Sequence, residues 1–249
     1  MIKQIKLLSA ITIMISVILF SNHAYSQQIA APNKQLSLSE KSIISISSFT
    51  AQGKLRELKI ALIKGLEAGL TVNEIKEILV HLYAYCGFPR SIRGLQTFME
   101  VLNERKKLGI TDSIGREASP IKDIETKYEH GKMILEELTK TPQPNQLNGY
   151  AAFAPVIDTF LKEHLFADIF ERDLLTYAQR ELVTISVIAS IGNAEPMLRS
   201  HLVISLNLGF TEGQLKEFGA ILKSTIAPKE ALVAENVILG IIKEREVKK

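Results

Sequence analysis

The chain has 249 residues, with 30 Lys and Arg against 27 Asp and Glu, and a formal net charge of +3 at pH 7. This balance argues against nucleic-acid binding, which requires a strongly basic patch. Cys86 is the single cysteine, so an internal disulfide and a C-x-x-C redox pair are both excluded. We predict neither a metal nor a cofactor, because no zinc-type spacing links the later histidines, which are His81, His130, His164 and His201.

Residues 1–26 predict a secretory signal peptide. Lys3 and Lys6 provide a basic start, and the apolar run 7–20 is short for a membrane span. Residues 24–26, Ala-Tyr-Ser, then match the small-x-small pattern of a cleavage site. We therefore expect export to the periplasm, a mature start at Gln27 and no stable membrane span after cleavage. An uncleaved membrane anchor is the alternative.

Residues 27–38 predict a flexible lead-in to the first helix. Residues 43–49 alternate between apolar and polar side chains, as a strand would. Their counterpart later in the chain, 181–192, instead has apolar residues at helical spacing. We therefore interpret both segments as helices.

Two segments of the chain resemble each other at an offset of 140 residues, namely 55–79 and 195–219. In each, a glycine ends one helix and a Thr-x-x-Glu/Gln capping box begins the next. The matched pairs are Leu58 with Leu198, Gly69 with Gly209, Thr71 with Thr211 and Glu77 with Glu217. This recurrence predicts an internal duplication.

The predicted fold is all-α, with two tandem pseudo-equivalent helical bundles at 39–110 and 150–245. A linker over 111–149, rich in turn-forming residues, contains one short helix near 124–138. In the first bundle, a helix from about residue 72 to residue 86 ends in the Gly-Phe-Pro turn at 87–89. No stretch of the chain has a convincing sheet pattern.

Three polar residues share one face of the helix after Thr71: Glu74, Glu77 and His81. Glu77 and His81 have i,i+4 spacing, so the carboxylate is expected to fix the imidazole tautomer and raise its pKa. Such a pair suits general acid or base catalysis. A solvated surface pair without function is the alternative.

His201 lies in the second repeat and aligns with Ala61, whereas His81 aligns with Ile221. His81 and His201 therefore occupy non-equivalent positions in the two copies. This pattern fits one composite site or two specialised sites. A partly buried histidine bonded to a backbone group is the alternative.

Several neighbouring residues are candidates for substrate contact. Arg172 and Arg180 are suited to clamping a carboxylate through two parallel hydrogen bonds, although pairing with surface acids is also possible. Tyr85 and Cys86 follow His81 on the same predicted helix. A lone reactive thiol at Cys86 remains a second possibility.

The segment 74–90 resembles the signature of the carboxymuconolactone decarboxylase family. That signature runs from a G-x-T helix start through E-x-x-E and a histidine to Y-x-G-x-P, as in residues 69–89 here. The second copy resembles the family's other hallmark, from residues 166–175 through Arg180 and Glu181 to His201. The resemblance covers about 40–107 and 150–240.

The resemblance implies an all-helical, alkyl hydroperoxidase D-like fold that self-associates into a trimer or a hexamer-like assembly. Glu77, His81 and His201 match positions that act in proton transfer. We additionally expect Arg172, Arg180, Glu74, Tyr85 and Cys86 to contact the substrate. The implied activity is that of a carboxy-lyase on a small carboxylated lactone or related acid. Two alternatives are alkyl hydroperoxidase or peroxiredoxin-type activity through Cys86, and a non-catalytic protein that binds a small ligand.

Overall fold

The computed structural model describes residues 35–121, 126–144 and 146–247, and these contain helices, turns and loops but no strand. The all-α prediction is therefore confirmed. The predicted signal peptide, 1–26, and most of the lead-in lie outside the described residues. Among the residues that are described, no helix combines the length and apolar character needed to cross a membrane.

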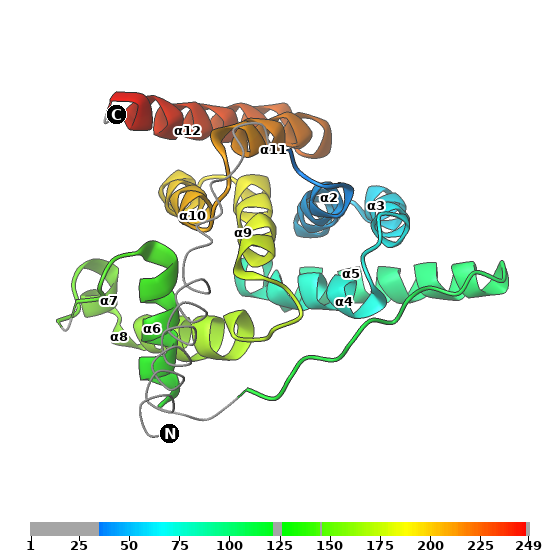
Figure 1. Ribbon diagram of the computed structural model, residues 1–249, viewed down its shortest axis with the longest axis horizontal. Coiled ribbons are helices and arrows are strands. Elements are labelled where there is room, and N and C mark those ends of the chain that lie inside the picture. The colour runs from blue at the N-terminus through cyan, green and yellow to red at the C-terminus, as the bar shows by residue number, and fades with distance from the viewer. Residues whose placement is uncertain (1–34, 122–125, 145, 248–249) are drawn as a thin grey trace, which may run out of the picture. The chain divides into compact units, whose positions relative to one another are not determined.

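The helices follow one another with short connections, apart from the long loop after α5 (Figure 1). The first half contains α2 (Leu38–Gln52), α3 (Leu55–Glu67), α4 (Val72–His81) and α5 (Tyr83–Lys107). The middle contains α6 (Lys127–Thr139), α7 (Gly149–Phe153), α8 (Pro155–Thr159) and the π-helix η1 (Phe160–Phe170). The last part contains α9 (Tyr177–Ile191), α10 (Glu195–Asn207), α11 (Glu212–Thr225) and α12 (Pro228–Val247).

Helix α9 is the central element of the bundle. It packs against α2, α4, α5, α10 and α12, and its ten consecutive residues 180–189 are all buried. A helix surrounded on every side is normally apolar on every side. Arg180, Glu181 and Thr184 are therefore exceptions, because they place polar side chains inside an otherwise apolar core.

The strand-like segment 43–49 lies within α2, so the helical interpretation is confirmed. The turn predicted at 87–89 is a kink inside α5, where Gly87 has φ 80° and ψ 160°. A positive φ of this kind is accessible to glycine at little cost. The helix predicted over 72–86 is divided at Leu82, a break that no glycine or proline signals.

Two pairs of corresponding helices have equal lengths in the two halves, whereas α4 has 10 residues and α11 has 14. Helices α3 and α10 have 13 residues each, and α2 and α9 have 15 each. Capping boxes begin α4 at Thr71 and α11 at Thr211, and others begin α2 at Ser37 and α9 at Thr176. The common helix lengths agree with the duplication predicted from sequence, which stays a prediction.

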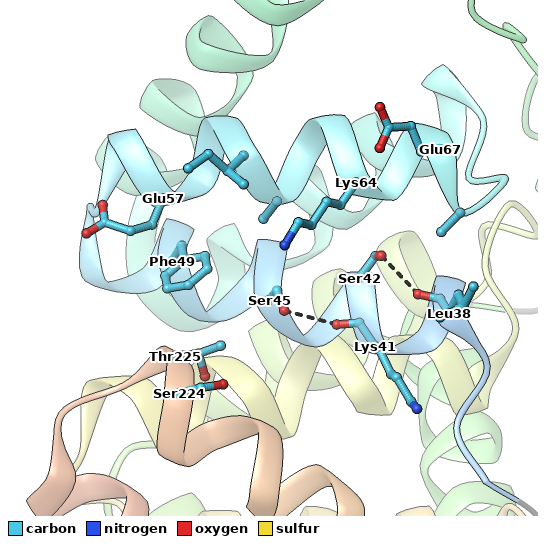
Figure 2. Close-up of a pocket in the computed structure, with 13 residues that line it drawn as sticks. Leu38, Lys41, Ser42, Ser45, Phe49, Glu57, Lys64, Glu67, Ser224 and Thr225 are labelled. Atoms are coloured by element: carbon cyan, nitrogen blue, oxygen red, sulfur yellow. Dashed lines mark hydrogen bonds between the residues drawn. The ribbon is translucent and has the colours of Figure 1, made fainter.

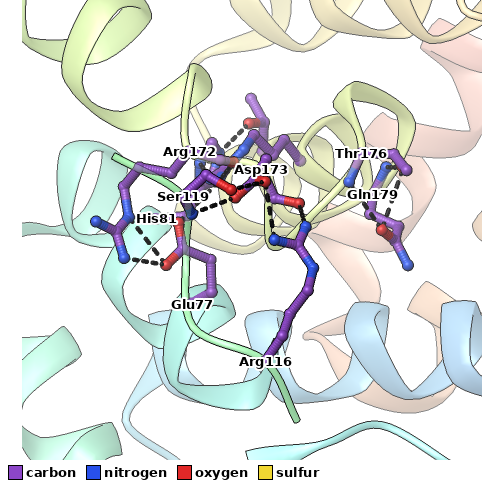
Figure 3. Close-up of polar contacts among 10 residues, drawn as sticks. Glu77, His81, Arg116, Ser119, Arg172, Asp173, Thr176 and Gln179 are labelled. Carbon is purple, nitrogen blue, oxygen red and sulfur yellow. Dashed lines mark hydrogen bonds and ion pairs between the residues drawn. The ribbon is translucent and has the colours of Figure 1, made fainter. Parts of the chain in front are cut away.

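The loop after α5 runs across the molecule and is attached beside the start of α9. Asp173 accepts hydrogen bonds from the Ser119 amide at 2.9 Å and the Ser119 hydroxyl at 2.8 Å. Arg116 pairs with the same carboxylate at 2.8 Å. These bonds, led by the one from the Ser119 amide, lower the pKa of Asp173 to about 2. The attachment fixes the segment that carries the neighbouring Arg172 (Figure 3).

Candidate functional site

A buried charged cluster forms where α4 meets α9. Glu77 from α4 is 2% exposed, and Arg180 from α9 is fully buried. Arg180 Nη2 donates to Glu77 Oε1 at 2.8 Å. Burial of a charge is tolerated when an opposite charge and hydrogen bonds compensate it. The two helices are therefore joined by an ion pair at the centre of the fold.

Arg172 binds the same carboxylate from the side nearer the solvent. Its Nε donates to Glu77 Oε1 at 2.9 Å, and its Nη2 donates to Oε2 at 3.0 Å (Figure 3). The carboxylate between Arg172 and Arg180 is thus the protein's own. Arg180 also donates to the backbone carbonyl of Arg172. Arg172 and Arg180 were expected to bind a substrate carboxylate. In the structure they bind the Glu77 carboxylate instead.

His81 is fully buried and bonded through both ring nitrogens. Arg180 Nη1 lies 3.2 Å from its Nδ1, and Thr184 Oγ1 lies 3.0 Å from its Nε2. Burial, together with the charge of Arg180 and the neighbouring His201, lowers the pKa of His81 well below its ordinary value. The prediction that Glu77 raises this pKa is wrong, because the Glu77 carboxylate is directed to the two arginines.

Tyr85 lies between the two histidines that the sequence singled out. Its ring centroid is 5.6 Å from that of His81 and 6.1 Å from that of His201. Its hydroxyl is buried near Thr184 but has no well-aligned hydrogen bond in the described part of the chain. Burial, with the nearby negative charge of Glu181, raises the pKa of Tyr85. Tyr85 therefore keeps its proton and presents a donor with no fixed acceptor.

His201 forms a pair with a buried carboxylate on α9. Its Nδ1 lies 2.9 Å from Glu181 Oε2, and Glu181 is fully buried. His201 Nε2 has no hydrogen bond to any described residue. A carboxylate at Nδ1 holds the proton there and leaves Nε2 free to exchange one. The alternative of a backbone-bonded His201 is wrong, since its partner is a side chain.

Three buried polar atoms of this region lack a hydrogen-bond partner among the described residues: Tyr85 Oη, Arg180 Nε and Glu181 Oε1. Buried groups of this kind normally have partners, so their accumulation at one place calls for an explanation. A bound water or substrate would satisfy them. The unpaired atoms come from α5 and α9. Glu181 belongs to the His201 pair, and the Tyr85 ring is 6.1 Å from the His201 ring.

Glu181 and Thr184 were not predicted as site residues. The sequence signal was the occurrence of charged and hydroxyl residues within the apolar run 181–192. Burial of an Arg-Glu dipeptide in a central helix is uncommon unless both groups have partners.

Two predicted contact residues have other roles. Glu74 forms the capping box of α4, where its Oε2 accepts from the Thr71 amide and hydroxyl, each at 2.8 Å. The Cys86 thiol donates to the Leu82 carbonyl at 3.3 Å, and burial raises its pKa to about 11. A thiol that stays protonated is a poor nucleophile, which opposes the Cys86 redox hypothesis.

The structure brings Glu77, His81, Tyr85, Arg180 and His201 into one composite cluster built from both halves of the chain. Arg172 lies at its edge, with 39% of its side chain exposed. Within the described residues, no group of His, Cys, Asp and Glu is arranged to hold a metal ion. A cavity of about 580 Å³ lies elsewhere, between α2, α3 and the end of α11.

A model of the carboxymuconolactone decarboxylase family matches residues 22–98. The match includes Glu77, His81 and Tyr85, whereas Arg180, Glu181 and His201 lie beyond it. No curated protein is significantly similar to the chain. The chain thus has an all-α, alkyl hydroperoxidase D-like fold, and residues 22–98 match the carboxymuconolactone decarboxylase family.

Proposed function

We propose that the protein is an enzyme that acts on a small carboxylated lactone or a related acid by general acid/base proton transfer. The observation that carries this proposal is the Glu181–His201 pair, with its 2.9 Å hydrogen bond beside unpaired buried polar atoms. A carboxylate-bound imidazole with one free nitrogen is a common proton-transfer device. His201, rather than His81, is assigned this role, since both nitrogens of His81 are already bonded.

Arg172 is the cation of the cluster that an anionic substrate could reach. Arg172 and Arg180 share the carboxylate of Glu77, and Arg172 also faces the carboxylates of Asp173 and Glu117. Arg172 is the partly exposed member of the pair. A substrate carboxylate would therefore bind at the Arg172 edge of the cluster, where it would compete with the protein's own carboxylates for the guanidinium.

In the proposed decarboxylation, the bond between the substrate carbon and its carboxylate breaks and carbon dioxide leaves. The electron pair passes into the conjugated carbonyl system of the lactone. Protonated His201 then delivers its Nε2 proton to the substrate carbon, while Glu181 stabilises the imidazolium before transfer. A proton from water restores His201, so the net change is replacement of carboxylate by hydrogen.

The test is a spectroscopic assay of the exported form, from Gln27 onward, with 4-carboxymuconolactone. His201→Gln should lower turnover by about 10²-fold or more, the usual contribution of a general acid or base. The control is His164→Gln, because His164 is half exposed and pairs with Asp168 away from the cluster. Both variants remove one imidazole. The proposal is therefore supported only if turnover falls in His201→Gln and not in His164→Gln.

Undiminished turnover in His201→Gln would contradict the assignment of the proton donor. Absence of turnover in the wild type would contradict lactone decarboxylation and favour the non-catalytic ligand-binding alternative. Export and self-association into a trimer or hexamer-like assembly belong to the same proposal. They are tested by cell fractionation and by light scattering of the purified protein.

A further inference from the structure

The ion pair at the candidate site has a counterpart in the other half of the chain. Lys41 on α2 binds Glu217 on α11 at 2.7 Å, as Arg180 on α9 binds Glu77 on α4 at 2.8 Å. Glu217 follows Glu77 by 140 residues, and Arg180 follows Lys41 by 139. The offset of 139 also separates the N-caps of α2 and α9, which are Ser37 and Thr176.

The same offsets match four other polar residues of the candidate site with smaller side chains. The pairs are Glu181 with Ser42, Thr184 with Ser45, His201 with Ala61 and Tyr85 with Thr225. All four smaller residues line the cavity of about 580 Å³ (Figure 2). The space that imidazole, phenol and carboxylate groups occupy in one half is therefore open in the other. Its volume is typical of small-molecule sites.

We propose that this cavity binds an amphipathic monocarboxylate, an apolar molecule with one terminal carboxylate. The apolar body would contact the lining side chains of Leu38, Phe49, Ile60 and Ala61. The carboxylate would bind the Lys64 ammonium. This ligand site is separate from the candidate active site and does not depend on the proposed reaction.

The hydroxyl groups of the cavity do not supply the anion contact. Ser42 donates to the Leu38 carbonyl at 2.9 Å, and Ser45 donates to the Lys41 carbonyl at 3.1 Å (Figure 2). Ser224 and Thr225 likewise donate to the Ile221 carbonyl. Each hydroxyl hydrogen is thus already used within its own helix, and only oxygen lone pairs face the cavity.

The charged side chains that line the cavity favour a ligand with one carboxylate over a ligand with two. Lys41 is bound to Glu217, whereas Lys64 has no ion pair with a described residue and extends from α3 toward α2 (Figure 2). Glu67 pairs with Arg105 at 3.7 Å. Glu57, two turns before Lys64 on α3, also lines the cavity and would repel a second anionic group. A monoanion therefore fits better than a dianion.

The experiment is calorimetric titration of the protein with octanoate, the neutral analogue octanamide and the dicarboxylate azelate. Octanoate should bind saturably with one site per chain and more tightly than either analogue. Lys64→Met should weaken octanoate binding by about 10-fold or more, since a charge-assisted hydrogen bond is lost while the apolar stem is kept. Glu57→Gln should strengthen azelate binding.

The matched control is Lys59→Met, because Lys59 is also on α3 but pairs with Glu104 and does not line the cavity. It should bind octanoate as the wild type does, and so should His201→Gln. Absence of saturable octanoate binding would overturn the proposal. Binding that Lys64→Met leaves unchanged, or that His201→Gln abolishes, would place the ligand elsewhere and overturn it as well.

Discussion

Arg180 Nη1 lies 3.2 Å from His81 Nδ1 in the buried contact between α9 and α4. A guanidinium donates and does not accept, so Nδ1 must carry a lone pair. The ring proton is therefore on Nε2, where it is donated to Thr184 Oγ1 at 3.0 Å. Arg180 thus determines the tautomer of His81 and favours its neutral form.

The neutral state of His81 predicts a pH dependence of stability. In the unfolded chain a histidine titrates near pH 6.5, whereas burial and Arg180 lower the pKa in the folded protein. The unfolded state therefore binds more protons below pH 6.5, and stability is lost as the pH falls through that value. We expect the free energy of unfolding to drop by up to about 1.4 kcal/mol per pH unit between pH 6 and pH 5.

Urea unfolding at a series of pH values measures this slope. His81→Gln should flatten it, because the amide can keep both hydrogen bonds and does not titrate. His164→Gln is the comparison, because it removes an imidazole that is half exposed and not buried. An unchanged slope in His81→Gln would assign the proton uptake to another group.

Glu77 is the single carboxylate between two arginines, and its loss should be costly. Glu77→Gln leaves the buried Arg180 guanidinium without a counter-charge. Breaking a buried ion pair from one side costs about 3–5 kcal/mol. We expect a loss of this size in the free energy of unfolding, measured by chemical denaturation with the fold checked by circular dichroism.

Arg172→Gln provides the matched comparison for Glu77→Gln. Arg172 is partly exposed, and its removal leaves the Arg180–Glu77 contact in place. Its cost should be at most about 1 kcal/mol, as for a solvent-screened pair. Equal losses in the two variants would show that the buried contact is not the dominant member of the cluster.

Much of the fold follows from local patterns in the sequence. The capping boxes at Thr71 and Thr211 predicted where two helices begin, because such signals act over a few residues. Gly87 was predicted to end a helix in a turn, and the structure has a kink within α5 there. The break at Leu82 was missed, since both flanking helices have apolar spacing and neither glycine nor proline separates them. Such a boundary depends on tertiary packing, which local patterns do not contain.

The sequence singled out several residues of the buried cluster but did not predict how they pair. Spacing on one helix suggested Glu77 with His81, while the structure pairs Glu77 with Arg180 across 103 residues. His201 similarly pairs with Glu181 on the preceding helix. Long-range partners depend on how α9 packs against α4 and α10, so the sequence indicated the chemical groups and left their contacts open.

The Cys86 thiol should react slowly in the folded protein. Its pKa of about 11, against a usual value of 9.0, leaves about 100-fold less thiolate near pH 8. Alkylation by iodoacetamide at pH 8 should therefore be about 100-fold slower in the native state than in urea. Native-state alkylation as fast as in the unfolded chain would contradict the structure and restore the Cys86 redox hypothesis.

Gly131 marks a close contact between α6 and η1. A Cβ built at this position would clash with the backbone carbonyl oxygen of Lys162, and a backbone atom cannot rotate away. Gly131→Ala should therefore force α6 and η1 apart and destabilise the protein by about 1–3 kcal/mol, as overpacking does.

The control is Gly240→Ala in α12, where nothing lies within 4 Å. It should stabilise the protein by up to about 1 kcal/mol through helix propensity alone. Thermal unfolding of both variants should thus shift the midpoint in opposite directions, and a stabilising Gly131→Ala would show that α6 does not pack on η1 this closely.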